Sequence, residues 1–595
     1  MSSLEQQLFK EVEACLVELF SGDIPADQIQ LQATRKDFEG DLTLVVFPLL
    51  RSSKKSPEQT AQIIGESLTN SSDLVDSFNV VKGFLNLVIT PTYWLNFLQE
   101  IRSNETFGYA TPNSSGKDMV EYSSPNTNKP LHLGHLRNNF LGNSVARILE
   151  ANGKEVVKVQ IINDRGIHIC KSMLAWQKFG NGETPESSGL KGDKLVGNYY
   201  VKFDQEFKKE VEQLKNSGVE EGQAKKEAPL MLEAQEMLRK WENDDAAVRA
   251  LWSKMNQWVY DGFSGTYKTM GVEFDKLYYE SETYLLGKEQ VIKHESSDLL
   301  YRKEDGSIWI NLEAEGLDNK LLLRSDGTSV YMTQDIGTAI VREEEFHCDN
   351  YYYVVGNEQD YHFNVLAVIL QKMGYTWANG IQHLSYGMVD LPSGKMKSRE
   401  GTVVDADDLM EEMRLTAKET SEGLGKLNEM SDEEQSTLFK MIGMGALKYF
   451  ILKVDPKKRM LFDPQESVDF NGNTGPFIQY AYARIQSILR KVAVDSKTNE
   501  LSASLMCQED LETIKKIHEF PNILKEAGEA KSPAIIANYI YDLVKTFNHF
   551  YQNTPPIVRE ENEPLKQFRL LICSKTGELI KNGMNLLGIE VPNQM

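Results

Sequence analysis

The chain has 595 residues, of which 41% are hydrophobic and 26% are charged; at roughly 150 residues per domain this composition predicts three or four globular domains. No apolar run reaches the ~18 residues of a membrane span, and the glutamate-rich first twenty residues do not resemble a signal peptide, so we expect no membrane association. The net charge of −22 excludes nucleic-acid binding through overall charge, so a nucleic-acid partner would need a local basic face.

Residues 1–110 are predicted to form a compact α+β module. A helix is expected from about Leu4 to Leu19, an apolar run follows at 42–47, and a second helical stretch precedes strand-like alternation over 83–89. The Thr, Pro, Asn, Ser and Gly residues of 111–117 are typical of a linker and indicate a domain boundary.

A strand–helix–strand unit is predicted next. Residues 119–123 form a short apolar strand, and a helix is expected from about Gly134 to Ala151, with its apolar residues on one face. A second strand is expected over 156–162. Such a unit opens a doubly wound, Rossmann-like parallel sheet, in which ligands bind beyond the carboxyl ends of the strands.

The rest of the chain is predicted to add to this sheet and then to become helical. The charged, helical stretch of about 188–284 is expected to be an insertion, and strands are expected to resume near 308–310, 351–355 and 381–386. Beyond about Asp405 helical periodicity dominates. The predicted fold is therefore an α/β domain at 111–405 and a C-terminal all-α bundle at 406–595, both following the N-terminal module.

The first motif that could carry chemistry is His132-Leu133-Gly134-His135, at the junction of the loop and the first helix of the sheet. The N–H groups at a helix N-terminus bind phosphate, and histidines placed there can donate hydrogen bonds to phosphate oxygens. A metal-binding pair or chance is the alternative interpretation of this motif alone. Its position after a strand and before an amphipathic helix favours the phosphate site.

The second motif is the basic stretch 394–401, Gly-Lys-Met-Lys-Ser-Arg-Glu-Gly. It follows a predicted strand and is flanked by glycines, which is typical of a mobile basic loop. Taken alone it could be a solvated surface turn.

The two motifs together resemble the two signatures of class I aminoacyl-tRNA synthetases. The first signature is usually His-Ile-Gly-His, and the second is usually Lys-Met-Ser-Lys-Ser. Lys395 and Met396 match the second, but Ser398 then stands where its second lysine is expected. In the arginyl-tRNA synthetase family this signature is often degraded and a lysine just before the first signature compensates, so Lys129 and Arg399 are the candidate replacement cations.

Further motifs resemble the arginyl-tRNA synthetase family in particular. They are the Glu-Tyr-Ser-Ser-Pro-Asn run of 121–126, the Tyr-Met-Thr-Gln-Asp run of 331–335, the Gln-Asp-Tyr-His run of 359–362, and the stretch 470–481, which resembles the start of the family's anticodon-binding domain. The Glu-Gly-Asp of 39–41 resembles the family's N-terminal tRNA-binding module. The resemblance covers nearly the whole chain.

The resemblance implies an arginine–tRNA ligase, which activates arginine with ATP to arginyl-adenylate and transfers it to the 3′ end of its tRNA. It assigns catalysis to His132, His135, Lys129 and Lys395. It assigns ATP binding to His132, Gly134, His135, Lys395, Met396, Ser398 and Arg399. Mg²⁺ is expected only with ATP, whose phosphates it bridges.

Arginine recognition follows from the chemistry of its side chain. The guanidinium is planar, carries five donors and stays charged, so a selective pocket needs carboxylate acceptors. The resemblance assigns Asp335 to the guanidinium, Tyr331, four residues earlier on the same helix face, to its edge, and Gln359 to the same pocket. It assigns Glu121, Ser124 and Asn126 to the rest of arginine. Without the resemblance, Tyr331 and Asp335 would simply decorate a helix.

The expected partners are tRNA, arginine and ATP, with the protein acting as a monomer in the cytoplasm. Five scattered cysteines without a Cys-x-x-Cys pair predict no structural metal and no disulfide framework. Basic residues at 51–55, 453–459 and 484–491 are candidates for the RNA-binding face. Two alternatives remain: a nucleotidyltransferase of another kind, which would leave the helical C-terminal third without a purpose, and a synthetase-like RNA binder without catalysis.

Overall fold

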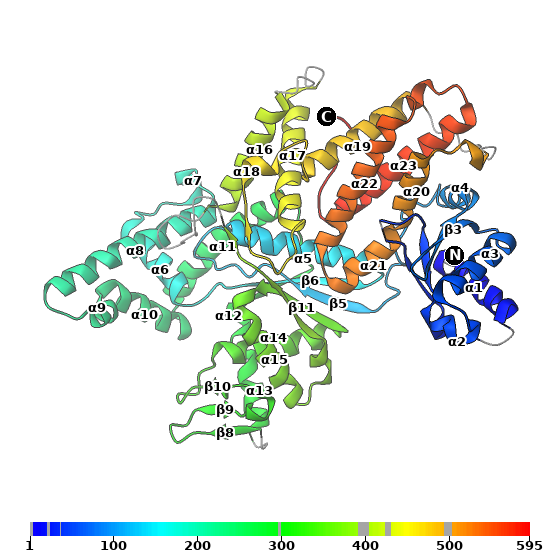
Figure 1. The fold of residues 1–595 in the computed structure, drawn as a ribbon. Coiled ribbons are helices and arrows are strands. Elements are labelled where there is room, and N and C mark those ends of the chain that lie inside the picture. Colours follow the sequence, from blue (N-terminus) through cyan, green and yellow to red (C-terminus); the bar gives the residue numbers. More distant parts are fainter. Residues whose placement is uncertain are drawn as a thin grey trace. The chain divides into compact units, whose positions relative to one another are not determined.

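The computed structural model describes residues 4–20, 24–35, 37–295, 299–390, 404–422, 430–492 and 502–595. They form two compact units. The first combines Met1–Phe107, Ile488–Glu519 and Lys545–Glu578, and the second combines Gly108–Ser487, Phe520–Val544 and Leu579–Met595. Both units thus contain C-terminal segments, which are drawn in orange and red in Figure 1.

The first unit contains a four-stranded antiparallel sheet in the order β1-β2-β4-β3. Its strands are β1 (Gln30–Ala33), β2 (Leu42–Val45), β3 (Val75–Val81) and β4 (Phe84–Ile89). β4 confirms the strand expected over 83–89, and β2 lies in the apolar run of 42–47. β1 and β3 were not predicted from the sequence, because their mostly exposed or half-buried residues lack a clear buried face.

Helices complete the first unit. α1 (Leu4–Phe20) confirms the first predicted helix, and α3 (Pro57–Ser71) begins at a capping box formed by Ser56 and Gln59. The others described wholly within this unit are α2 (Leu50–Ser53), α4 (Pro91–Glu100) and α20 (Gln508–His518). Trp94 and Phe97 of α4 contact the ring of His518 edge-on, with centroids 5.4 and 4.8 Å away. Aromatic packing therefore joins the N-terminal module to a C-terminal helix within this unit.

The second unit is built on a five-stranded parallel sheet in the order β12-β11-β5-β6-β7. Its strands are β5 (Lys117–Glu121), β6 (Glu155–Ile162), β7 (Lys276–Tyr279), β11 (Asn350–Gly356) and β12 (Ile381–Tyr386). The chain adds strands outward on one side of β5 and then on the other, which confirms the doubly wound prediction. The strand order reverses between β5 and β11, and ligands bind at such a switch point.

Two strand assignments need correction. β7 lies inside the stretch of 188–284 that was predicted to be an insertion, yet it pairs with β6 in the parallel sheet. The strand expected near 308–310 forms as β9 (Ile308–Ile310), but it belongs to a separate antiparallel sheet with β8 (Leu300–Arg302) and β10 (Lys320–Leu323). In both cases local pattern does not reveal which distant strand supplies the hydrogen-bonding partner.

The remainder of the predicted insertion is helical, as expected. Its helices are α8 (Gly192–Asn216), α9 (Glu221–Glu227), α10 (Pro229–Glu242) and α11 (Ala246–Met270), and α6 (Ile167–Phe179) and α7 (Pro185–Ser188) lead into it. Trp241 is 1% exposed and packs edge-on against Trp252, so it anchors the core of these helices.

α5 (Leu133–Ala151) confirms the helix predicted after the histidine motif, but most of its polar residues are buried too. Several of them have partners: Ser144 Oγ donates to the carbonyl of Leu586 at 2.8 Å, and Arg137 donates to three backbone carbonyls. The one-sided apolar pattern therefore did not predict that both sides of the helix would be covered.

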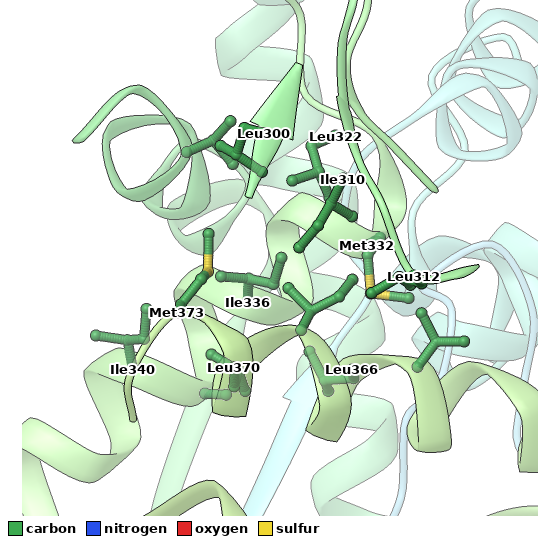
Figure 2. Close-up of a cluster of buried hydrophobic side chains, with 14 of the residues drawn as sticks. Leu300, Ile310, Leu312, Leu322, Met332, Ile336, Ile340, Leu366, Leu370 and Met373 are labelled. Atoms are coloured by element: carbon green, nitrogen blue, oxygen red, sulfur yellow. The ribbon is translucent and has the colours of Figure 1, made fainter. Parts of the chain in front are cut away.

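A second core joins the three-stranded sheet to α14 (Tyr331–Phe346) and α15 (Asp360–Lys372). Figure 2 shows Ile336 and Ile340 of α14 and Leu366 and Leu370 of α15 directed into the same apolar cluster as Ile310. α13 (Leu286–His294) packs closely on α14 at Gly287 and Gly337. A Cβ at Gly287 would lie 1.6 Å from the carbonyl oxygen of Thr333, so only glycine permits this approach. α12 (Glu280–Thr283) precedes these helices.

Ile336 should be among the most sensitive core positions of this cluster. Its side chain is fully buried, so Ile336→Ala is expected to lower the free energy of unfolding by about 2–5 kcal/mol, through lost burial and a residual cavity. Ile336→Val, which removes one methylene, should cost about 0.5–1.5 kcal/mol. Denaturant titration of both variants measures these differences, and equal stability of Ile336→Ala and wild type would contradict the packing in Figure 2.

The region beyond Asp405 is mainly helical, as predicted. Its helices are α16 (Ala406–Glu422), α17 (Asp432–Leu452), α18 (Pro464–Ser467), α19 (Gly475–Lys491), α21 (Phe520–Ala530), α22 (Pro533–Asn553) and α23 (Glu563–Leu586). The expectation that no strand follows Asp405 is corrected by β14 (Met460–Leu461), which pairs in parallel with β13 (Val389–Asp390). Within the described ranges, no helix is long and apolar enough to cross a membrane.

Candidate active site

A cavity of about 670 Å³ lies at the switch point of the parallel sheet. Its lining residues come from the loop after β5, the start of α5, the end of β11 and the segment after it, the end of β12 and the region of the β13–β14 pair. They are Ser124, Asn126, His132, Gly134, His135, Asn138, Val355, Gly356, Glu358, Gln359, Tyr386, Met388, Val389, Asp390 and Arg459. The sheet therefore opens its cavity where the fold predicts a ligand.

The two histidines cap the N-terminus of α5. The Nδ1 of His132 accepts a hydrogen bond from the N–H of Gly134 at 3.2 Å, and the Nδ1 of His135 accepts one from the N–H of His132 at 3.1 Å. The ring centroids are 3.9 Å apart. A neutral ring whose Nδ1 accepts carries its proton on Nε2, so each ring keeps an Nε2–H that can donate to a ligand.

Both histidines are neutral at pH 7. Burial and, to a smaller extent, the charge of Lys129 lower the pKa of His132 to about 3. Burial also lowers the pKa of His135 well below its usual value, with contributions from His132 and Lys129. The pair therefore offers hydrogen-bond donors to phosphate oxygens but no positive charge, so the cations must come from other residues.

We expect neither histidine of the motif to take up a proton between about pH 8 and about pH 5, because burial disfavours the imidazolium. In histidine-labelled protein, the ring resonances of His132 and His135, assigned with His132→Gln and His135→Gln, should keep constant chemical shifts over this range. Free imidazole in the same sample provides a titrating reference. A midpoint near ~6.5 for either ring would contradict the neutral pair.

Lys129 lies beside the histidines but lines a neighbouring cavity of about 130 Å³. His132, Lys194 and Asp405 line the same small cavity, and Lys194 pairs with Asp405 at 3.0 Å. Burial lowers the pKa of Lys129. Lys129 is not among the described residues that line the larger cavity. Its predicted contact with ATP phosphates therefore requires its side chain to reach past His132.

Three of the predicted arginine-binding residues, Ser124, Asn126 and Gln359, line the larger cavity. Glu121 lies deeper, in β5, and its carboxylate forms an ion pair with the buried guanidinium of Arg342 from α14. Burial raises the pKa of Glu121, and Arg342 opposes this effect. The charge of Asp335 also raises this pKa, so the two predicted carboxylates lie within electrostatic reach of each other.

Tyr331 and Asp335 meet a third residue, His362. The Nε2 of His362 lies 2.6 Å from Oδ2 of Asp335, and its ring centroid lies 5.2 Å from that of Tyr331. The Tyr331 side chain is otherwise open, with 62% of its residue surface exposed, and the negative charge of Asp335 raises its pKa. α14 and α15 thus bring a tyrosine, a carboxylate and an imidazole together. The spacing of four residues had predicted that Tyr331 and Asp335 lie on one side of a helix.

Several residues at the cavity were not assigned from the sequence. Asn138 is the most central: its Oδ1 accepts from the N–H of Ser123 at 2.6 Å, and its Nδ2 donates to the carbonyl of Val354 at 2.6 Å and to the Tyr386 hydroxyl at 3.3 Å. It therefore ties α5 to the ends of β5, β11 and β12. Two consecutive asparagines, Asn138 and Asn139, within one turn of His135 were the signal that could have identified it.

The second signature lies outside the described residues, which end at Asp390 and resume at Val404. The roles expected for Lys395, Met396, Ser398 and Arg399 therefore stay predictions. Described residues on either side of this segment lie near the histidine motif. Asp390 lines the same cavity as His132, and His132 forms an antiparallel bridge with Asp405.

Comparison with known proteins identifies the domain families to which parts of the chain belong. Residues 98–463 match the family described as tRNA synthetases class I (R), catalytic domain. Residues 6–89 match the arginyl tRNA synthetase N terminal domain, and residues 478–595 match the DALR anticodon binding domain. The chain therefore has the catalytic domain of a class I tRNA synthetase.

Full-length relatives narrow the class to one family. The chain is 57% identical to an arginine–tRNA ligase of Bacteroides thetaiotaomicron, 56% to one of Flavobacterium psychrophilum and 53% to one of Porphyromonas gingivalis, each over 100% of both chains. The fold is similar to that of Thermus thermophilus arginyl-tRNA synthetase, with a TM-score of 0.76 at 23% identity over 100% of both chains. The chain belongs to the arginyl-tRNA synthetase family.

Proposed function

We propose that this protein activates arginine with ATP and transfers it to the 3′ end of a tRNA. The observation that carries the proposal is the pair of neutral, Nε2–H-bearing histidines at the N-terminus of α5, set in the switch-point cavity of a member of the family. This geometry suits a ligand with phosphate groups.

In the first step the carboxylate of arginine is itself the nucleophile, because it is ionised at pH 7, so no protein base is needed. One of its oxygens forms a bond to the α-phosphorus of ATP. The bond from that phosphorus to the bridging oxygen breaks, and its electron pair leaves with pyrophosphate. His132 and His135 donate hydrogen bonds to the phosphate oxygens as charge shifts onto them, while Lys129 and Lys395 supply positive charge.

In the second step a ribose hydroxyl of the terminal adenosine attacks the activated carbonyl, and AMP leaves. We place arginine with its guanidinium at Asp335, Tyr331 and Gln359 and its α-amino and carboxylate groups toward Glu121, Ser124 and Asn126. The contact of His362 with Asp335 holds that carboxylate in place. The buried Glu121–Arg342 pair limits Glu121 to an electrostatic role on the amino group unless the pair rearranges.

ATP would bind through His132, Gly134 and His135, with Lys395, Met396, Ser398 and Arg399 on the opposite side. Mg²⁺ enters with ATP as part of the substrate. Within the described residues no group of three or more His, Cys, Asp or Glu side chains could hold a metal ion by itself.

We assign residues 1–110 to the tRNA-binding module, 111–405 to catalysis and 406–595 to anticodon binding, in a cytoplasmic monomer. Tyr551, which is 37% exposed, is a better candidate for base stacking than Tyr539, Phe547 or Phe550, which are buried. Positive residues on an acidic protein would make tRNA binding salt-sensitive, because phosphate contacts release counterions.

A set of omission reactions tests the function. The protein is incubated with arginine, ATP and total tRNA, and each component is left out in turn. Arginyl-tRNA should form only in the complete mixture. Nucleotide transfer without arginine would favour another nucleotidyltransferase, and RNA binding without product would favour a non-catalytic protein.

A further inference from the structure

The switch-point cavity is short of positive charge. Its two histidines are neutral, and Glu358 and Asp390 bring carboxylates to its wall. Among the described residues that line it, Arg459 is the one with a cationic side chain. Among the described lining residues, Arg459 would therefore supply the positive charge to a nucleoside triphosphate bound in this cavity.

The backbone around Arg459 is rigidly tied to the histidine-bearing helix. Arg137 of α5 donates through Nη2 to the carbonyls of Pro456 at 3.0 Å and Lys458 at 2.8 Å, and through Nη1 to that of Met388 at 3.2 Å. The neighbouring strands add two bonds, from the N–H of Met460 to Met388 and from that of Phe462 to Asp390. One buried guanidinium thus holds the backbone next to Arg459 in a fixed position relative to the helix that begins at His132 and His135.

The side chain of Arg459 is free to engage a ligand. Its Nε donates to the carboxylate of Asp390, and within the described ranges this is the guanidinium's one hydrogen bond. The Arg459 side chain is 59% exposed, and an exposed ion pair of this kind is weak enough to rearrange. The two terminal amino groups form a planar fork that matches phosphate oxygens.

We propose that Arg459 is a catalytic residue that binds the β- and γ-phosphates of ATP in the activation step. It acts as the bond between the α-phosphorus and the bridging oxygen breaks, and its guanidinium stabilises the negative charge that builds up on pyrophosphate. Arg459 thereby adds a cation to a second signature in which Ser398 stands at the position of a lysine. The proposal rests on the proposed function. It also changes the expectation for the basic residues 453–459, because it directs Arg459 to ATP and not to RNA.

The test uses the full-length protein with tRNA present. Arginine-dependent exchange of pyrophosphate into ATP is measured for wild type, Arg459→Ala and Arg459→Lys. Arg459→Ala should lower the maximal rate by ~100-fold, as for loss of one preorganised donor to a transition-state oxyanion. Arg459→Lys, which keeps the charge but not the fork, should recover part of the rate. Inhibition by pyrophosphate should weaken in Arg459→Ala, whereas inhibition by AMP should not change.

Arg302→Ala is the matched control. Arg302 is also an exposed arginine, 52% at its side chain, and pairs with a carboxylate through Nε, but it lies in β8, outside the cavity. It should leave all these values unchanged, and both variants should melt at the wild-type temperature.

Three results would overturn the assignment: an unchanged exchange rate in Arg459→Ala, a weakened AMP inhibition with pyrophosphate inhibition intact, or an effect confined to the KM for tRNA. The first would leave Arg459 without a role in activation, the second would place it at the adenosine, and the third would return it to RNA. Absence of arginine-dependent exchange in the wild type would instead refute the proposed function itself.

Discussion

Asp335→Asn is expected to weaken arginine binding by about 2–5 kcal/mol, the usual result of removing one partner from a hydrogen-bonded charge pair. This corresponds to an affinity about 30-fold lower or more. Asparagine keeps the shape and one oxygen for His362, but it lacks the charge that a guanidinium requires. Calorimetric titration with arginine and with ATP measures both affinities, and that for ATP should remain near wild type.

Asp318→Asn provides the control for this experiment. The carboxylate of Asp318 accepts a hydrogen bond from the hydroxyl of Tyr361, the neighbour of His362 on α15, at 2.9 Å. It is exposed and is not assigned to arginine. The variant should bind arginine normally. Unchanged arginine affinity in Asp335→Asn would show that another acceptor reads the guanidinium and would remove the basis for the assignment of Tyr331.

Lys395→Ala is expected to slow arginine activation by ~2.7–4 kcal/mol in the free energy of the transition state, or ~10²–10³-fold in rate. The reason is the charge balance of the cavity. The neutral histidines leave pyrophosphate to be stabilised by lysine and arginine, and a contact made mainly in the transition state changes rate and not affinity. Steady-state activation rates and arginine calorimetry together test this, and arginine affinity should barely change.

Lys397→Ala is the control that distinguishes a specific role of Lys395 from an effect of the total positive charge of the loop. Lys395 aligns with the first lysine of the signature, whereas Lys397 stands at the third position, where serine is usual. A much smaller loss in Lys397→Ala would support the alignment. Equal losses in the two variants would mean that the loop acts through total charge, and a wild-type rate in Lys395→Ala would make the loop assignment wrong.

The parts of the site that the sequence predicted are those with local causes. The histidines were placed at a helix N-terminus by the apolar pattern that follows them, and the structure confirms that helix as α5. Tyr331 and Asp335 were placed on one side of a helix by their spacing of four residues, and both contact His362. Helical and strand periodicity depends on neighbours in the chain, so it can be recognised without knowledge of the fold.

Other features needed the tertiary structure, because they depend on residues far apart in the chain. β7 and β9 were separated into different sheets only by their hydrogen-bond partners. The neutrality of His132 and His135 follows from burial, which composition does not reveal. The role of Asn138 also depends on distant residues, because it links the ends of three strands. Arg459 lies at the cavity because Arg137, more than three hundred positions earlier in the chain, binds the carbonyl of the preceding residue, Lys458. The sequence by itself therefore determined the family, the doubly wound class of the fold and the histidine helix, whereas long-range packing decided which strands pair, which polar residues face the cavity and which of them carry charge there.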